Sequence, residues 1–265
     1  MTAYLAFLRA GFRRYATYRL ATVAGAFTNS VFGLARAAIL ASAVAGAGVG
    51  SPGGYTATQV ITYAWLGQAL ITPVNVFQWN ELALRVRTGD IAIDLARPVD
   101  LQLSWLATDL GRAGYSLLPR SLPPVLIGAL LFGLALPAHP LPYLLGALSV
   151  LLAVVISFAC RFAVNLTAFW LVEIRGVIGS YVAISSLLCG LVVPVSWFPG
   201  WLDTLATATP FPSLLQAPID VITGRVSGTA ALGTLAVQAF WAVATLGVGR
   251  AVLHRATRKL VVQGG

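Results

Sequence analysis

Long runs of apolar residues, most of them free of charge, constrain the fold of this chain more than any other feature of its sequence. A helix needs about 20 apolar residues to cross roughly 30 Å of hydrocarbon, and six runs approach or exceed that length. We expect membrane spans at Leu20–Val44, Thr56–Phe77, Leu117–Leu136, Tyr143–Leu166, Val177–Val193 and Thr229–Val252. The predicted fold class is therefore an all-α integral membrane protein with six transmembrane helices, forming a single domain over residues 1–265.

The scarcity of charge supports a membrane environment. Charged residues make up only 9% of the chain, whereas a soluble globular domain carries about 25%. The net charge of +9 comes almost entirely from arginine, since Lys259 is the single lysine. Such a balance can indicate a nucleic-acid partner, but arginines that flank apolar spans are better explained by the positive-inside rule. We therefore expect lipid, and no nucleic acid, around this chain.

The distribution of arginine predicts how the chain is oriented in the membrane. The N-terminus, the second and fourth connections and the C-terminus are basic, whereas AGAGVGSPGG is uncharged and the long fifth connection has a single arginine, Arg225. Both termini are therefore expected in the cytoplasm. The basic residues on that side are Arg9, Arg13, Arg14, Arg19, Arg85, Arg87, Arg97, Arg112, Arg175, Arg250, Arg255, Arg258 and Lys259.

Two segments outside the predicted spans have their own patterns. Residues 1–19 place Leu5, Leu8 and Phe12 at helical spacing among arginines, which predicts an interfacial helix; the alternative is an extension of the first span. Residues 194–225 are apolar and aromatic but interrupted by prolines. We expect this extracytoplasmic stretch to form re-entrant helices in the outer leaflet that pack on protein.

A few polar side chains within the predicted spans are candidates for lining a transport pathway: Asn29, Arg36, Gln68 and Asn75. Arg36 lies deep in the first span, where it either reaches the outer headgroups or faces the interior of the bundle. Gln68 and Asn75 share one helix face, and interhelical hydrogen bonding explains them equally well. Arg161 is expected to extend toward the cytoplasmic headgroups.

Several functional classes lack the residues they need. The only lysine occurs in KLVV, so a GxxxxGK[ST] phosphate-binding loop cannot be present; His139, His254, Cys160 and Cys189 have no metal-site spacing. We therefore expect no catalytic residue, metal or cofactor in this chain. No carboxylate falls within a predicted span, which argues against a proton- or sodium-driven transporter. Five of the acids lie in the second connection: Glu81, Asp90, Asp94, Asp100 and Asp109.

The stretch RVRTGDIAIDLARPVD concentrates charge in a chain that has few charged residues. Asp90 is predicted to cap a short helix over IAIDLAR, which Pro98 ends. Asp94 and Arg97 are i, i+3 neighbours, and Ile91 with Leu95 forms an apolar ridge. So short a helix is unstable alone. It either lies on its own bundle or inserts into a groove of another protein, unless it is an ordinary amphipathic loop helix.

Three motifs carry a family resemblance: RTGDIAIDLARPVD after the second span, PFPSLLQAPIDVITG before the sixth, and the terminal VVQGG. With them the chain resembles the membrane subunits of ABC-2 type ABC transporters, and in particular the short six-span bacterial permeases that include viologen-exporter-like systems. The resemblance implies a coupling helix within 79–112 that docks on an ATPase subunit. The docking residues it implies are Arg87, Gly89, Asp90, Ile91, Asp94, Leu95, Arg97 and Pro98.

The resemblance also implies partners and an activity. Two permease subunits, identical or paralogous, would form the pathway, and ATP and Mg would bind in separate ATPase subunits. The expected function is efflux of a small hydrophobic or amphiphilic compound. The alternatives are an ATP-independent secondary transporter or channel, and a membrane scaffold or enzyme, for which the sequence offers least support.

Overall fold

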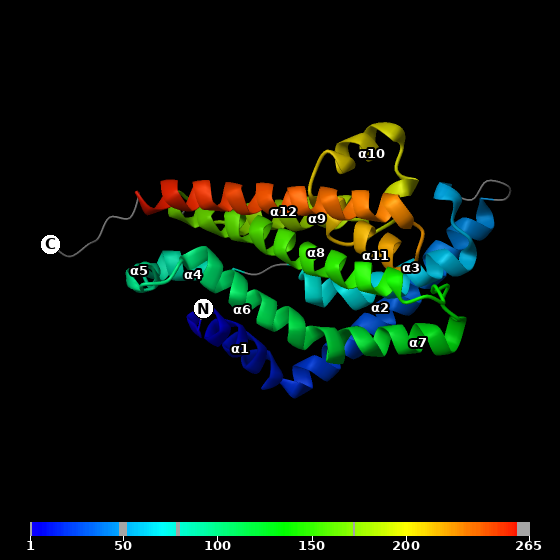
Figure 1. Cartoon of the computed structure of the whole chain (residues 1–265), viewed down its shortest axis with the longest axis horizontal. Coiled ribbons are helices and arrows are strands. Elements are labelled where there is room, and N and C mark those ends of the chain that lie inside the picture. The colour runs from blue at the N-terminus through cyan, green and yellow to red at the C-terminus, as the bar shows by residue number, and fades with distance from the viewer. Residues whose placement is uncertain (1, 48–51, 78–79, 172, 259–265) are drawn as a thin grey trace.

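The computed structural model describes residues 2–47, 52–77, 80–171 and 173–258, without the side chains of Arg19 and Ala21; Lys259 and the terminal VVQGG lie outside the described residues. Within these ranges every regular element is a helix (Figure 1). The α-helices are α1 Thr2–Ala16, α2 Arg19–Gly46, α3 Ala57–Val74, α4 Glu81–Thr88, α5 Ile91–Ala96, α6 Leu101–Ser116, α7 Leu122–Phe132, α8 Leu141–Leu166, α9 Arg175–Leu188, α10 Gly200–Thr207, α11 Gln216–Ile222 and α12 Gly228–Thr257.

Among the described residues, four helical segments are long and apolar enough to cross a membrane: Thr22–Gly46, Leu101–Phe132, Leu141–Phe169 and Gly228–Thr257. The first, third and fourth of these confirm the predicted first, fourth and sixth spans to within a few residues. The helices α3 and α9 coincide with the second and fifth predicted spans but are shorter, so the count of six spans stays a prediction. The chain is nonetheless an all-helical, multi-pass membrane protein.

The predicted third span begins too late. The structure joins α6 to α7 through a π-helical turn at Leu117–Ser121, so one helical segment runs from Leu101 to Phe132. Pro119 lies in the wide turn, and Pro123 and Pro124 lie in the first turn of α7, where a missing backbone N–H costs little. The prolines therefore do not mark the start of the helix. As a result, the predicted coupling segment 79–112 includes the first part of this long helix.

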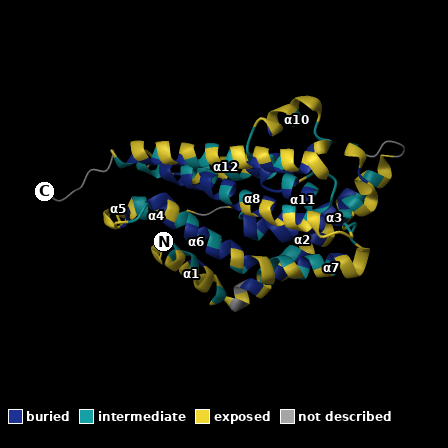
Figure 2. Cartoon of the chain, in the orientation of Figure 1, coloured by how far each residue is buried: buried dark blue, intermediate teal, exposed yellow. Residues whose placement is uncertain are grey.

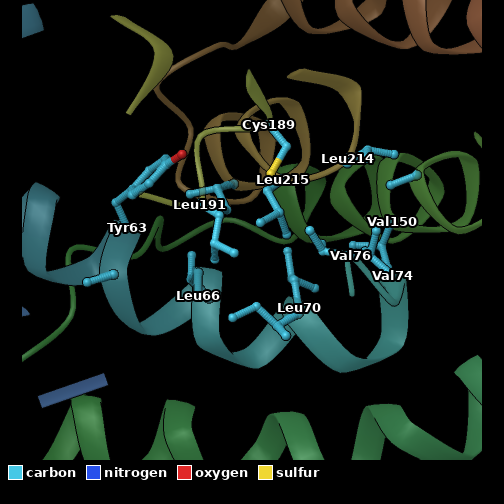
Figure 3. Packing of buried hydrophobic residues seen from close by; sticks show 14 of the residues in the cluster. Tyr63, Leu66, Leu70, Val74, Val76, Val150, Cys189, Leu191, Leu214 and Leu215 are labelled. Atoms are coloured by element: carbon cyan, nitrogen blue, oxygen red, sulfur yellow. The ribbon is translucent and has the colours of Figure 1, made fainter. Parts of the chain in front are cut away.

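Helix α3 forms the centre of the bundle. It begins with a capping box, in which Thr56 Oγ1 accepts the Gln59 N–H and the Gln59 side chain accepts the Thr56 N–H. It packs against α2, α7, α8 and α11. Figure 3 shows Leu66 and Leu70 directed toward Leu191 and Leu215. Because protein surrounds it, α3 is buried around nearly its whole circumference.

The outer surface of the bundle is apolar. Phe27 and Phe32 on α2 and Phe240 and Val243 on α12 are all exposed, and Figure 2 shows exposed residues repeating along α2, α7 and α12. In water such a surface would be a large aggregation hazard. In a bilayer it faces acyl chains, which agrees with the spanning helices.

Helix α1 is a separate element rather than an extension of the first span. It ends at Ala16, before α2 begins at Arg19, and it packs along α6 (Figure 1). Two glycines allow this contact: a Cβ on Gly11 would lie 2.1 Å from the Thr108 carbonyl oxygen, and one on Gly111 would lie 2.0 Å from that of Leu8. Its position at the membrane interface stays a prediction.

The segment before α12 forms short helices, as the prolines suggested. Helix α10 stands away from the bundle, whereas α11 lies against α8 (Figure 1). Gln216 on α11 joins this segment to the core: its Oε1 accepts from Tyr63 Oη at 2.9 Å and from the Val195 N–H at 2.9 Å. Its Nε2 donates to Asp220 Oδ2 at 2.7 Å. The bond to Tyr63 therefore joins this segment to α3, and the other two join parts of the segment to one another.

Candidate functional site

The charged stretch that stood out in the sequence forms two short helices, α4 and α5. They lie at the end of the bundle where α1 begins and α12 ends (Figure 1). Gly89 ends α4 in the left-handed conformation (φ 82°), which glycine adopts without strain. Arg97 is extended (ψ 143°), as expected before Pro98. The predicted helix IAIDLAR is thus confirmed over Ile91–Ala96, but α4 before it was not anticipated.

Asp94 fastens α5 to α4. Its carboxylate receives two hydrogen bonds from Arg85, one from Nε and one from Nη2 at 3.0 Å, and this pairing raises the pKa of Arg85 above its ordinary value. The predicted Asp94–Arg97 pair is present at the longer distance of 3.6 Å. The predicted cap is wrong: the Asp90 carboxylate accepts from Thr88 Oγ1 at 2.7 Å and makes no cap hydrogen bond.

Neighbouring helices hold this pair in place. Asn165 Oδ1, at the end of α8, accepts the Ala83 N–H at 3.2 Å and so satisfies a free donor in the first turn of α4. From α1, Arg14 Nη1 lies 2.9 Å from both oxygens of the Glu81 carboxylate. The α4–α5 pair is therefore anchored to α8 and α1 by specific contacts.

The α4–α5 pair has an inner and an outer face. Leu82 and Ile91 pack with Phe158 and Phe162 of α8 in one apolar cluster. Helix α5 therefore lies on its own bundle, with Ile91 in the contact. Of the predicted docking residues, Ile91 and Asp94 are buried and Leu95 is half-buried. The exposed ones are Arg87, Gly89, Asp90, Arg97 and Pro98.

Two exposed apolar residues on the outer face were missed in the sequence. Leu84 on α4 is 56% exposed and Ile93 on α5 is 59% exposed, whereas Ile91 is 2% exposed. Neither residue belongs to the predicted Ile91–Leu95 ridge. An apolar residue outside that ridge was the feature of the sequence that could have identified them. We define the α4–α5 face as Leu84, Arg87, Asp90, Ile93 and Arg97.

A buried charge cluster lies farther along the bundle. The Asp109 carboxylate accepts from Arg112 Nε at 2.7 Å and from Arg161 Nη2 at 2.9 Å. Arg112 also donates to the carbonyl oxygens of Thr72 and Pro73 at 2.7 and 2.9 Å, in the last turn of α3, where the carbonyl groups lack the usual i+4 helical donor. Asp109, Arg112 and Arg161, here the Asp109 cluster, thus join α3, α6 and α8.

This cluster corrects two predictions. Asp109 was placed in a connection, yet it lies in the helical segment Leu101–Phe132 that is long enough to span. Arg161 was expected to extend toward headgroups, but it is only 2% exposed and pairs with Asp109. The physical reason is that a carboxylate and a guanidinium satisfy one another inside the protein, which lowers the cost of burying either.

The α4–α5 pair and the Asp109 cluster are linked through one turn of α8. Asn165 accepts the Ala83 N–H with its oxygen and donates from Nδ2 to the Arg161 carbonyl oxygen at 2.8 Å. Arg161 in turn contacts Asp109 through its side chain. A displacement of α4 therefore acts on the same turn of α8 that carries the guanidinium of the cluster.

Three of the four candidate pathway residues come together. Asn29, Arg36 and Gln68 line one cavity of about 460 Å³ between α2, α3 and the stretch Leu191–Val193. Asn29 Nδ2 donates to the Gln68 carbonyl oxygen at 3.4 Å, so interhelical hydrogen bonding accounts for part of this polar pattern.

Asn75 has a different position. It ends α3 in the left-handed conformation (φ 57°) and does not line the cavity. With its amide oriented to satisfy both of its polar ends, its oxygen accepts from Arg161 Nη1 at 3.0 Å and its nitrogen donates to the Phe77 carbonyl oxygen at 2.9 Å. Asn75 therefore extends the Asp109 cluster.

Comparison with protein families decides the identity of the chain. A model described as "ABC-2 family transporter protein" matches residues 32–264, which includes α3 to α12 and most of α2. The chain belongs to this ABC-2 transporter family. A search of curated proteins found no match. As a member of the ABC-2 family, the chain is a transport permease of the membrane, and the resemblance seen in the sequence is confirmed at the level of the family.

Proposed function

We propose that this ABC-2 protein is the membrane-spanning subunit of an ATP-driven exporter of a small hydrophobic or amphiphilic compound. Two copies, or this chain and a paralogue, form the pathway in a bacterial inner membrane, with both termini in the cytoplasm. Separate ATPase subunits, which carry ATP and Mg, dock on the α4–α5 face. The observation that supports this most is a firmly anchored helix pair that nevertheless exposes Leu84 and Ile93.

The contacts of α4 and α5 suit a segment that receives force. Exposed apolar side chains that alternate along the chain with exposed arginine and aspartate suit an interface core with a polar rim. Behind it, the Arg85–Asp94 and Ala83–Asn165 contacts bind the pair to α8. ATP-dependent closure of the ATPases would move this pair and favour the outward-facing state, because the two states differ in their contacts with the nucleotide-bound subunits.

Replacement of Ile93 by aspartate tests the docking. We expect Ile93→Asp to reduce recovery of an ATPase subunit encoded beside this chain by at least about tenfold, since burying an unpaired charge in an interface costs well over 1.4 kcal/mol. Ile93→Leu, which keeps the apolar contact, should recover the ATPase at the wild-type level. Permease yield from the membrane must stay equal in all three preparations.

Full recovery of the ATPase with both Ile93→Asp and Leu84→Asp would overturn docking on this face.

The main alternative is an ATP-independent transporter, which one observation favours: Asp109 places a carboxylate within a spanning helix. Two arginines already neutralise it, so we expect no substrate flux in liposomes that lack the ATPase. Flux under those conditions would favour the alternative.

A further inference from the structure

Arg36 on α2 is the starting point, because its charge is buried without a partner. Its Nε, Nη1 and Nη2 atoms are shielded from solvent and make no hydrogen bond to any residue that the structure describes. A buried guanidinium without a partner carries a large desolvation cost. An anion from outside this chain would offset that cost.

The side chain occupies space that a neighbouring glycine leaves open. Gly67 on α3 faces Arg36, and a Cβ at that position would lie only 3.3 Å from Nη1. Nη1 thus lies against the backbone of α3 rather than at the lipid surface. This proximity holds the charge at the wall of the cavity described above.

The cavity has the composition of a site for an amphiphile. Its volume of about 460 Å³ falls within the usual range of ligand pockets, about 300–1,000 Å³. Arg36, Asn29 and Gln68 supply its polar lining, and the remaining walls are mostly apolar. Those walls include Phe32, Ile39, Ile71, Leu191 and Val193.

A second copy of this chain offers no spare carboxylate among its spanning helices. Six of the eight acids are in ion pairs within the chain: Glu81, Asp94, Asp100, Asp109, Glu173 and Asp220. Of the other two, Asp90 lies between α4 and α5, and Asp203 lies on α10 outside the bundle. The partner of Arg36 is therefore better sought in a ligand.

We propose that the Arg36 cavity binds amphiphiles that carry one anionic headgroup. On binding, the Arg36 side chain turns its shielded guanidinium toward the headgroup and forms charge-assisted hydrogen bonds, for which its planar fork is suited. The apolar walls accept the chain of the amphiphile. This inference rests on the proposed transport function, since it names the class of compound transported. The shared chemistry also fits an anionic bilayer lipid, and the experiment separates the two sources.

Binding to the purified permease, without any ATPase, is the direct test. The probe is radiolabelled tetradecyl sulfate, whose charge is permanent, and tetradecanol is its neutral counterpart. We expect Arg36→Gln to weaken tetradecyl sulfate binding by at least about tenfold, or about 1.4 kcal/mol, because the anionic headgroup loses its charged partner. Tetradecanol carries no charge, so its binding should weaken by less than about twofold. Arg36→Lys should retain part of the affinity, because it keeps the charge but not the fork.

Arg9→Gln is the matched control, since Arg9 is exposed on α1 and its replacement removes one charge elsewhere. It should bind both probes as the wild type does. A second variant, Val193→Trp, keeps Arg36 and fills the cavity, so it should weaken both probes. Circular dichroism and gel filtration establish that each variant is folded and monodisperse.

Nanodiscs distinguish the two sources of the anion. If bilayer lipid occupies the site, phosphatidylglycerol will compete with tetradecyl sulfate; if transported compounds occupy it, phosphatidylglycerol will not. Equal affinity of Arg36→Gln and wild type for tetradecyl sulfate, or equal losses for both probes, would overturn the inference. Because no ATPase is present, this result is independent of whether Ile93→Asp prevents docking.

Discussion

Asp109 on α6 and Arg161 on α8 are 52 residues apart in the chain, yet their side chains meet at 2.9 Å in the interior. Arg112 completes the contact and donates to two carbonyl groups in the last turn of α3. Three helices are thus joined at one carboxylate. The carboxylate offsets the cost of burying the two arginines, so its removal should lower the stability of the fold substantially.

We predict that Asp109→Asn lowers the free energy of unfolding by about 3–5 kcal/mol, the usual cost of breaking a buried ion pair from one side. The loss arises because both guanidinium groups remain buried with only partial compensation. The thermal midpoint of the detergent-solubilised permease measures it. Asp203→Asn, which removes an acid that has no ion pair among the described residues, should leave the midpoint nearly unchanged. Equal midpoints for all three proteins would contradict the role of the cluster.

Two glycines on α6 provide a matched pair for the α1–α6 contact. Gly111→Ala should release α1, because the new Cβ would lie 2.0 Å from the Leu8 carbonyl oxygen. Gly114→Ala meets no atom within 4 Å and should stabilise α6 by roughly 0.5–1 kcal/mol, the helix-propensity difference. Limited proteolysis of α1, together with the thermal midpoint, measures both effects. Similar behaviour of the two variants would show that α1 does not depend on this close approach.

Asn165→Ala should loosen α4 without unfolding the bundle. The variant leaves the Ala83 N–H without its acceptor, and loss of such a cap costs about 1 kcal/mol. Hydrogen exchange in residues 82–88 should accordingly rise about fivefold, while exchange in α12 stays constant. Thr167→Ala, which removes a local hydroxyl contact to Val164, is the control. Unchanged exchange in Asn165→Ala would show that α4 is held by packing alone.

The stability of the segment that contains α11 should show a pH dependence that comes from Asp220. Burial raises the pKa of this carboxyl, although Gln216, Arg225 and Tyr55 oppose the shift. Because the folded pKa exceeds the unfolded value of about 3.9, the native state binds the proton more tightly. Asp220 therefore contributes most to stability at low pH, and that contribution declines as the pH rises through the folded pKa.

The difference in thermal midpoint between wild type and Asp220→Asn isolates this contribution from the other acids. Relative to Asp220→Asn, the thermal midpoint of the wild type should be higher near pH 4 than it is at pH 7. A difference that is constant across this range, or that grows with pH, would contradict the assigned direction.

The sequence was most informative where a single physical signal was strong. The runs at Tyr143–Leu166 and Thr229–Val252 are apolar for longer than a span requires, so α8 and α12 were predicted to within a few residues. Before the third span the prolines suggested a helix start. The helix instead continues past them through the π-helical turn at Leu117–Ser121. The helix begins at Leu101 because the Asp100 carboxylate caps it and accepts the Leu103 N–H at 2.8 Å.

The candidate sites show the same division. The ends of α5 followed from local rules for Gly89 and Pro98, and the gathering of Asn29, Arg36 and Gln68 followed from their shared polarity. The partners of Asp94 and Asp109 could not be assigned fully, since Arg161 is distant in the chain and Arg85 competes with the nearer Arg97. The i, i+3 spacing of Asp109 and Arg112 was the only local indication of the buried cluster.

The wide turn at Leu117–Ser121 divides the segment Leu101–Phe132 into two arms with different neighbours. The inner arm, α6, is fixed to α1 by the Gly11 and Gly111 approach, whereas the outer arm, α7, packs on α2 and α3. A π-helical turn, which is closed by i→i+5 hydrogen bonds, is a looser joint than the α-helical turns on either side. Bending of this segment during a transport cycle would accordingly concentrate at that joint, leaving each arm rigid and each set of neighbours undisturbed.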